Sequence, residues 1–204
     1  MLIVSLLIIL LAPTTSSAQG FKGREVLGIR LGGIVTQGGL KDVFGKGSEI
    51  ELYFIEGLGS WFGVDIAFSS HNLGESLDRE KNIEYLGYDR EIKLNIYSAT
   101  VAFVALGNIK KRLIPSLEAG GGLYSITAII PAGFYEGHIT DNQPGIYAGA
   151  ALDYRITKNL MAGASFKCHY IFSGSDDAHT TYFFTEEKRS VIYQITVGIT
   201  IFTG

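Results

Sequence analysis

The chain has 204 residues, a formal net charge of −3 and only 18% charged residues, so its composition gives no indication of a nucleic-acid-binding surface. A single cysteine, Cys168, excludes a disulfide framework and a cysteine metal cluster. With 26 glycines, 11 tyrosines, 12 phenylalanines and only 4 prolines, the composition favours an all-β chain of single-domain length.

The N-terminal segment differs in character from the rest of the chain. Residues 1–12 are apolar apart from Ser5, and residues 13–18 are small or polar. A run of this length is too short to cross a bilayer as a helix but fits the core of a signal peptide. No Lys or Arg precedes the run, so either the amino terminus supplies the positive charge or the natural start lies upstream. We expect a cleaved signal peptide at 1–18 and a mature domain at 19–204, with a buried N-terminal core segment as the alternative.

Segments of alternating apolar and polar residues follow along the whole mature chain. Successive side chains of a strand point to opposite faces, so alternation indicates strands whose two faces differ. The pattern predicts eight strands, at residues 26–34, 48–56, 61–70, 92–106, 113–126, 145–156, 160–172 and 190–202. In the fourth, the apolar phase shifts near Tyr97 and Ser98, which predicts a β-bulge there or simply reflects weak local patterning.

The last predicted strand shows the alternation most clearly. Bulky apolar residues occupy every second position: Val191, Tyr193, Ile195, Val197, Ile199 and Ile201. The residues between them are mostly small or polar until the ends of the strand. An apolar outer face with a polar inner face is the reverse of a soluble barrel and is typical of a barrel in a membrane.

The connections between the predicted strands alternate in length. Short turns fall at 57–60, 107–112 and 157–159, and long connections fall at 36–47, 70–90, 128–142 and 173–189. Up-and-down barrels of the outer membrane have tight turns on the periplasmic side and longer loops outside. The sequence therefore predicts an all-β fold, an eight-stranded antiparallel up-and-down transmembrane β-barrel.

The predicted inward face carries charged and polar side chains of both signs. An eight-stranded barrel is just wide enough for side chains to fill its interior, and charges buried there need partners. We expect a polar network that plugs the lumen, and an ion path or catalytic site is the alternative. The expected members of this network are Arg30, Glu51, Asp65, Glu118, Asp153, Arg155, Lys167, His169 and Gln194.

Motifs for catalysis or metal binding are scarce in the sequence. The histidines, at 71, 138, 169 and 179, do not form a spaced metal-binding set, and neither a G-x-S-x-G elbow nor a phosphate-binding loop is present. Ser173 and Ser175 lie close in sequence to His169, and Glu186 and Glu187 follow, so a Ser/His/Glu hydrolase acting on lipid at the rim of the barrel is an alternative. These residue types are, however, common in polar loops. We expect no enzymatic activity, no catalytic residues, no metal and no cofactor.

Residues 145–167 read G-I-Y-A-G-A-A-L-D-Y-R-I-T-K-N-L-M-A-G-A-S-F-K, a glycine-rich strand, a D-Y-R sequence, a short turn and a second strand. With the signal sequence, the eight alternating strands and the C-terminal T-V-G-I-T-I-F, the chain resembles the OmpA/OmpX/OmpW-like small outer-membrane β-barrel family over residues 20–204. That family usually ends on an outward-facing aromatic residue. Here Phe202 falls one register off, and Thr203 and Gly204 follow it.

The resemblance implies a protein exported to the cell outer membrane of a Gram-negative bacterium. Its implied partners are outer-membrane lipid, the assembly machinery during insertion and an extracellular ligand at the long loops, with no nucleic acid. Barrels of this shape serve several roles, so the resemblance implies no single activity. We expect a structural or surface-interaction role. A narrow pore for small solutes and a soluble lipocalin-like periplasmic barrel remain alternatives.

Overall fold

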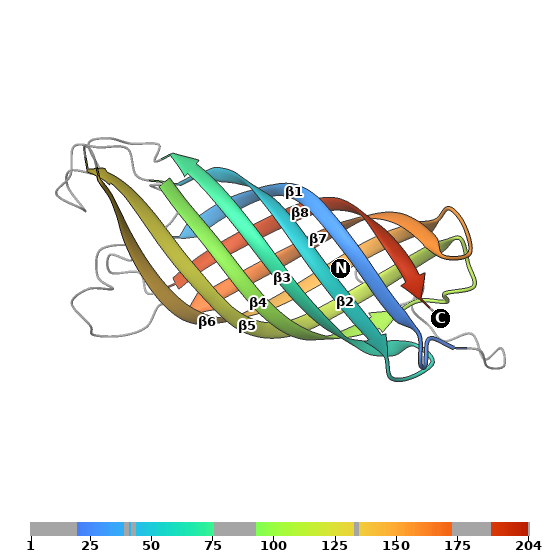
Figure 1. Ribbon diagram of the computed structural model, residues 1–204. Helices are drawn as coiled ribbons and strands as arrows, with labels where there is room; N and C mark the ends of the chain where they lie inside the picture. Colours follow the sequence, from blue (N-terminus) through green and yellow to red (C-terminus); the bar gives the residue numbers. More distant parts are fainter. Residues whose placement is uncertain are drawn as a thin grey trace.

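The computed structural model describes residues 20–38, 41, 44–75, 93–132, 135–172 and 189–203. These residues form eight strands: β1 (Glu25–Gly38), β2 (Lys46–Gly57), β3 (Phe62–Glu75), β4 (Lys93–Leu106), β5 (Leu113–Ala132), β6 (Tyr135–Arg155), β7 (Leu160–Phe172) and β8 (Arg189–Thr203). Each strand pairs antiparallel with the next, and β1 pairs with β8 to close the barrel (Figure 1). The predicted fold class is confirmed. The expected signal peptide lies outside the described residues.

The two faces of the barrel wall are inverted relative to a soluble protein. On β8, the outward Ile195 and Val197 are 64% and 63% exposed, whereas the inward Gln194 and Thr196 are 0% and 1% exposed. The same alternation runs along the other strands, and the residues expected in the polar network are buried on the inner face, except Arg155, which is half-buried. Within the described ranges, no helix is long and apolar enough to span a membrane.

Of the two explanations given for the phase shift near Tyr97 and Ser98, the β-bulge is wrong. Strand β4 alternates between buried and exposed residues over its whole length and pairs with β5 without a break in register. Leu94 and Ile96 point into the barrel and are fully buried there. The shift in apolar phase therefore reflects an apolar section of the interior and not an irregular backbone.

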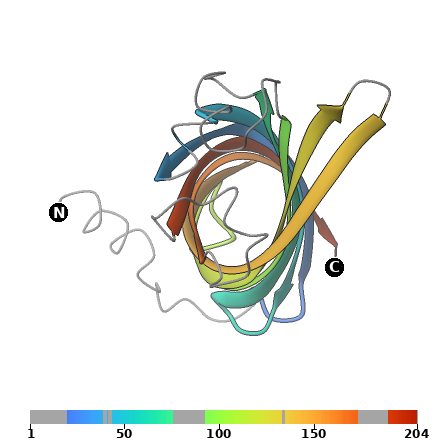
Figure 2. The same ribbon diagram turned by 90° about the vertical axis from the view of Figure 1, so that its left-hand side faces the viewer.

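The long loop expected at 128–142 is also wrong, because β5 and β6 continue through it as a hairpin. The two strands pair in register from Leu113 and Tyr154 at one end to Ala132 and Tyr135 at the other. On the β6 side, pairing with β7 extends only to Gly145, so the hairpin leans out beyond its neighbours (Figure 2). A strand beyond the lipid needs no apolar face, which explains why the alternation that marks the other strands is missing here.

At the end of the barrel with the short turns, backbone hydrogen bonds join the N-terminal segment and each turn to the end of a strand. The three turns predicted from sequence lie between β2 and β3, between β4 and β5, and between β6 and β7. The bonds run from Gly23 N to Gly57 O (2.7 Å), Leu106 N to Trp61 O (2.7 Å), Arg155 N to Arg112 O (2.7 Å) and Phe202 N to Asn159 O (2.9 Å). We call this region the turn end and the opposite one the loop end.

Candidate functional site: the barrel interior

The interior is divided into three layers along the barrel axis. A loop-end apolar layer consists of Ile34, Phe44, Leu73, Leu94, Ile96, Tyr124, Ile126, Ala128, Ile171 and Ile192. A turn-end apolar layer consists of Phe21, Val26, Tyr53, Ile55, Ala67, Val104, Leu106, Ile109, Ile114, Met161 and Phe202. Buried charged and polar side chains fill the space between them, and we call these the charged layer. The buried charged side chains are thus concentrated between two apolar layers, within the polar network that was expected from the sequence.

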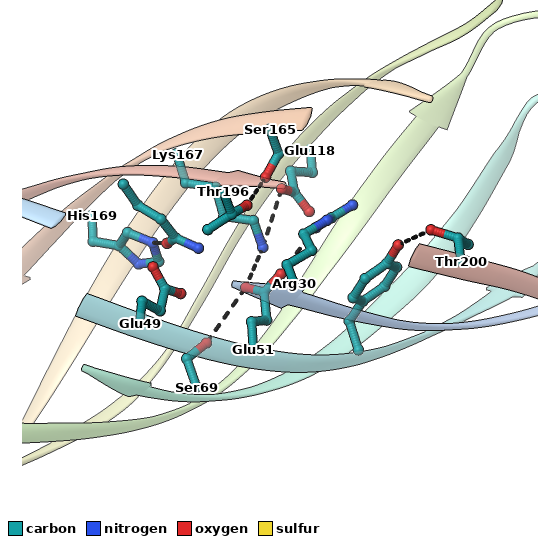
Figure 3. Close-up of polar contacts among 12 residues, drawn as sticks. Arg30, Glu49, Glu51, Ser69, Glu118, Ser165, Lys167, His169, Thr196 and Thr200 are labelled. Carbon is teal, nitrogen blue, oxygen red and sulfur yellow. Dashed lines mark hydrogen bonds and ion pairs between the residues drawn. The ribbon is translucent and has the colours of Figure 1, made fainter. Parts of the chain in front are cut away.

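Glu51 on β2 is the centre of the charged layer (Figure 3). Its Oε1 pairs with Arg30 Nη1 of β1 at 2.9 Å, and its Oε2 pairs with Lys167 Nζ of β7 at 2.7 Å. Lys167 Nζ also lies 3.2 Å from Glu118 Oε1 of β5. Ser69 Oγ donates a longer hydrogen bond of 3.4 Å to Glu51 Oε2. Four strands thereby converge on two cations and two carboxylates, all nearly excluded from solvent.

The strand register explains how these side chains meet. Arg30 and Glu51 are direct partners across β1 and β2. Glu118 and Lys167 both lie opposite Gly149, on either side of β6. A Cβ at Gly149 would lie 2.9 Å from Glu118 Oε1 and 2.9 Å from Lys167 Cγ. The glycine therefore leaves the space in which the lysine and glutamate can face each other.

A hydrogen-bonded chain adjoins this ion network on the loop-end side. The Tyr124 hydroxyl lies 2.8 Å from His169 Nδ1, and His169 Nε2 lies 2.6 Å from Gln194 Oε1. Because the amide oxygen of Gln194 can only accept, Nε2 carries the hydrogen, and the neutral ring then accepts from Tyr124 at Nδ1. Tyr147 stacks on the His169 ring at 5.1 Å with an interplanar angle of 18°.

Two buried ionisable residues of the charged layer, Glu49 and His71, were not in the predicted set. His71 Nδ1 lies 3.7 Å from Glu49 Oε2, and both side chains are almost completely buried. Glu49 lies in phase with Glu51 on the same predicted strand, so its inward position could have been found. His71 lies just past the predicted end of its strand, and continued alternation from Asp65 would have placed it inside.

Three members of the predicted set are less tightly joined to the network. Asp65 is buried and interacts with Glu118 and Lys167. Asp153 is buried beside Gly163, where an added Cβ would meet its Oδ1 at 2.1 Å. Arg155 is the outlier: it lies at the turn end of β6.

Buried hydroxyl pairs and an aromatic contact complete the charged layer, and no pattern in the sequence indicates them. Tyr53 and Thr200 share a 2.5 Å hydrogen bond although they are 147 residues apart, and Ser165 and Thr196 share another of 2.5 Å. The Arg30 guanidinium lies 3.9 Å from the centroid of the Tyr53 ring, in cation–π geometry. These contacts tie the ion network to the turn-end apolar layer.

Among the described residues, the interior holds fixed charges that are nearly excluded from solvent. Across the described part of the chain, no three His, Cys, Asp or Glu side chains are arranged to hold a metal ion. A hydrated ion crossing the barrel would have to pass two apolar layers and separate the pairs made by Glu51.

The closed eight-stranded up-and-down barrel with an apolar outer face has the fold of the small outer-membrane β-barrels. No protein-family model and no curated protein matches the sequence. Solved structures with this fold include neisserial surface protein A, with a TM-score of 0.59 and 13% identity over 88% of this chain and 97% of that one. OprG from Pseudomonas aeruginosa has a TM-score of 0.54 and 10% identity, over 92% and 99% of the two chains.

A third structure with this fold is Ail, the attachment invasion locus protein of Yersinia pestis, solved in complex with the heparin analogue sucrose octasulfate. Its TM-score is 0.53, with 12% identity over 89% of this chain and 99% of Ail. At these identities the likeness shows the fold alone. It agrees with the family resemblance found in the sequence.

Proposed function

We propose that this chain is a small integral outer-membrane β-barrel, closed to solutes, with a structural or surface-interaction role at its loop end. The observation that carries the proposal is the inversion of the barrel wall. Large apolar side chains face outward on every strand, while the charged layer is buried between two apolar layers. We propose no catalytic activity for it.

The outer face supports lipid as the surrounding medium. Phe103, Leu123 and Ile195 are 73%, 64% and 64% exposed on three different strands, and water would oppose such exposure. Exposed aromatic residues lie toward the turn end, at Trp61 and Tyr154, as expected at a membrane interface. A soluble lipocalin-like barrel would need these outward rows to be its core, and the strand register places them outside.

The buried charges support a closed barrel over a narrow pore. Arg30 and Lys167 both pair with Glu51, so the charges that would line a pore neutralise each other across the lumen. Phe21 and Phe44, each at most 2% exposed, belong to the apolar layers at the two ends. The backbone N–H and the hydroxyl of Thr36 donate to the 44–45 segment and hold it in place.

A surface role at the loop end is supported by the β5–β6 hairpin, which projects beyond the neighbouring strands (Figure 2). The polysulfated ligand seen with Ail does not suit this chain. The connection between β3 and β4, at residues 76–92, carries five acidic and three basic residues, and that between β7 and β8, at residues 173–188, carries four acidic and one basic. Loops with this charge balance favour a neutral or cationic ligand.

The proposal is tested by membrane fractionation, gel mobility and conductance on the same preparation. We expect the protein in the outer-membrane fraction, with a mobility on SDS gels that changes on boiling, and no stepwise current in planar bilayers. A protein found in the soluble periplasmic fraction without a mobility change would refute the membrane assignment. Regular conductance steps from a heat-modifiable barrel would instead establish the narrow pore.

A further inference from the structure

The turn end of the barrel is strongly basic. Seven Lys and Arg side chains lie there, against two carboxylates, Glu25 and Glu56. They come from the N-terminal segment, the β4–β5 turn, the end of β6 and the β6–β7 turn: Lys22, Arg24, Lys110, Lys111, Arg112, Arg155 and Lys158. The chain as a whole carries −3, so this concentration of positive charge is local.

The basic side chains project from backbone that is held in place. Arg155 N donates to Arg112 O at 2.7 Å, and Gly23 N donates to Gly57 O at 2.7 Å, so the β4–β5 turn and the N-terminal segment are bonded to the ends of β6 and β2. Arg24 is close enough to Arg155 for the two guanidinium groups to repel, and Arg155 Nε is buried without a hydrogen-bond partner. Like charges held together with an unused donor indicate a position for an anion.

The basic residues border the part of the outer face that lies in lipid. Leu113 follows Arg112 directly and is 52% exposed, and Ile156 follows Arg155 and is 56% exposed. Arg112 Nη1 also contacts the hydroxyl of the exposed Tyr154 at 3.4 Å. The cations thus lie at the level where aromatic side chains meet lipid head groups, and an anion there would be the phosphate of a lipid.

We propose that the turn end binds the phosphate-bearing head groups of anionic phospholipids, through basic side chains of the N-terminal segment, the β4–β5 turn and the end of β6. The inference rests on the proposed function, because it requires the barrel to lie in a bilayer. It predicts that the lipids next to the turn end are enriched in phosphatidylglycerol over a zwitterionic lipid. Enrichment of about fivefold corresponds to the effect of one Lys or Arg near an anionic surface.

Trp61 makes the proposal measurable, since it is the single tryptophan of the chain and lies in a turn bonded to the end of β4. The full-length mature barrel is folded into phosphatidylcholine bilayers that contain a minor fraction of phosphatidylglycerol, with one lipid or the other brominated. We expect brominated phosphatidylglycerol to quench Trp61 fluorescence as if it were enriched about fivefold. High sodium chloride should abolish the excess, because salt screens surface charge.

Two variants with the same change of charge separate a local site from a general effect. Lys110→Gln/Lys111→Gln/Arg112→Gln removes three exposed cations at the turn end and should reduce the excess quenching by brominated phosphatidylglycerol. Lys41→Gln/Lys46→Gln/Lys93→Gln removes three exposed cations at the loop end and should leave the enrichment intact. Equal quenching in the wild type, or equal loss in both variants, would overturn the proposal.

Two further measurements identify which idea has failed and which anion binds. Gel mobility before and after boiling is recorded for every sample. A heat-modifiable barrel without lipid preference refutes only this inference. A chain that forms no heat-modifiable barrel refutes the proposed function. Inorganic phosphate is compared with sodium chloride at equal ionic strength. Stronger displacement by phosphate would show a site for the free ion and would overturn the assignment to lipid.

Discussion

Lys167 is the side chain whose removal should disturb the charged layer most. Its ammonium group lies 2.7 Å from Glu51 Oε2 and 3.2 Å from Glu118 Oε1, and 5.2 Å from the centroid of the Tyr147 ring. Lys167 is 1% exposed, so water cannot replace the lost charge. Lys167→Met keeps the length of the side chain and removes only the ammonium group, which leaves two carboxylates facing each other with Arg30 alone to compensate.

Removing one partner of a buried ion pair costs about 3–5 kcal/mol, because the remaining charge stays buried and uncompensated. We expect Lys167→Met to lower the free energy of unfolding by that amount. Adding Glu51→Gln should recover part of the loss, with a coupling energy of about 1–3 kcal/mol. Lys110→Met, at an exposed position of a turn, should change stability by less than about 0.5 kcal/mol.

The assay is reversible urea unfolding of the barrel in lipid vesicles, followed by the fluorescence of Trp61. Boiled and unboiled gel samples show that each variant reaches the closed state before unfolding is measured. A loss below about 1 kcal/mol for Lys167→Met would show that its partners are hydrated, since exposed pairs have that value. Strict additivity of Lys167→Met and Glu51→Gln would equally refute a desolvated network.

Three further changes test other parts of the fold. Gly32→Ala should destabilise the barrel by about 1–3 kcal/mol in the same urea assay, because the added Cβ would meet a backbone carbonyl oxygen of β8 at 2.1 Å. Gly33→Ala is the control and should be neutral, because the atom nearest to its Cβ is 3.8 Å away. Val197→Arg, in the middle of a lipid-facing row, should lower the free energy of unfolding by about 2–4 kcal/mol, against about 0–1 kcal/mol for Ile156→Arg at the turn end. Equal losses would show that the two residues lie at the same depth in the bilayer. Phe21→Ala, which empties a fully buried site, should cost about 3–5 kcal/mol yet leave the barrel without conductance in planar bilayers, because the charged layer stays in place.

The barrel wall could be predicted from sequence because lipid constrains every strand in the same way. Each residue of β8 from 191 to 201 lies on the face that the alternation assigned to it. The alternation of apolar and polar residues fails to predict structure where no lipid contacts the strand. Beyond the membrane the β5–β6 hairpin has no apolar face to reveal it, and at Leu94 and Ile96 apolar residues fill the interior, so the apparent phase shift was misleading.

The residues that line the lumen could be predicted from the sequence, but not which of them pair with each other. Alternation places Arg30, Glu51 and Lys167 on the inner face, but it does not say that all three meet. Their meeting depends on the stagger between strands, which side-chain patterning leaves open. Tyr53 and Thr200 are the extreme case, since only the closed register brings them within 2.5 Å across 147 residues.

Phe21 and Phe202 lie near the two ends of the described chain, and their rings meet edge to face with centroids 6.4 Å apart inside the turn-end apolar layer. That layer cannot assemble until β8 has paired with β1, because its members come from both ends of the chain. Desolvation of Arg30 and Glu51 on the turn-end side therefore has to wait for the last strand. Barrel closure and burial of charge should then occur as one late, cooperative step of folding, and partly assembled barrels should keep a wet, weakly paired interior.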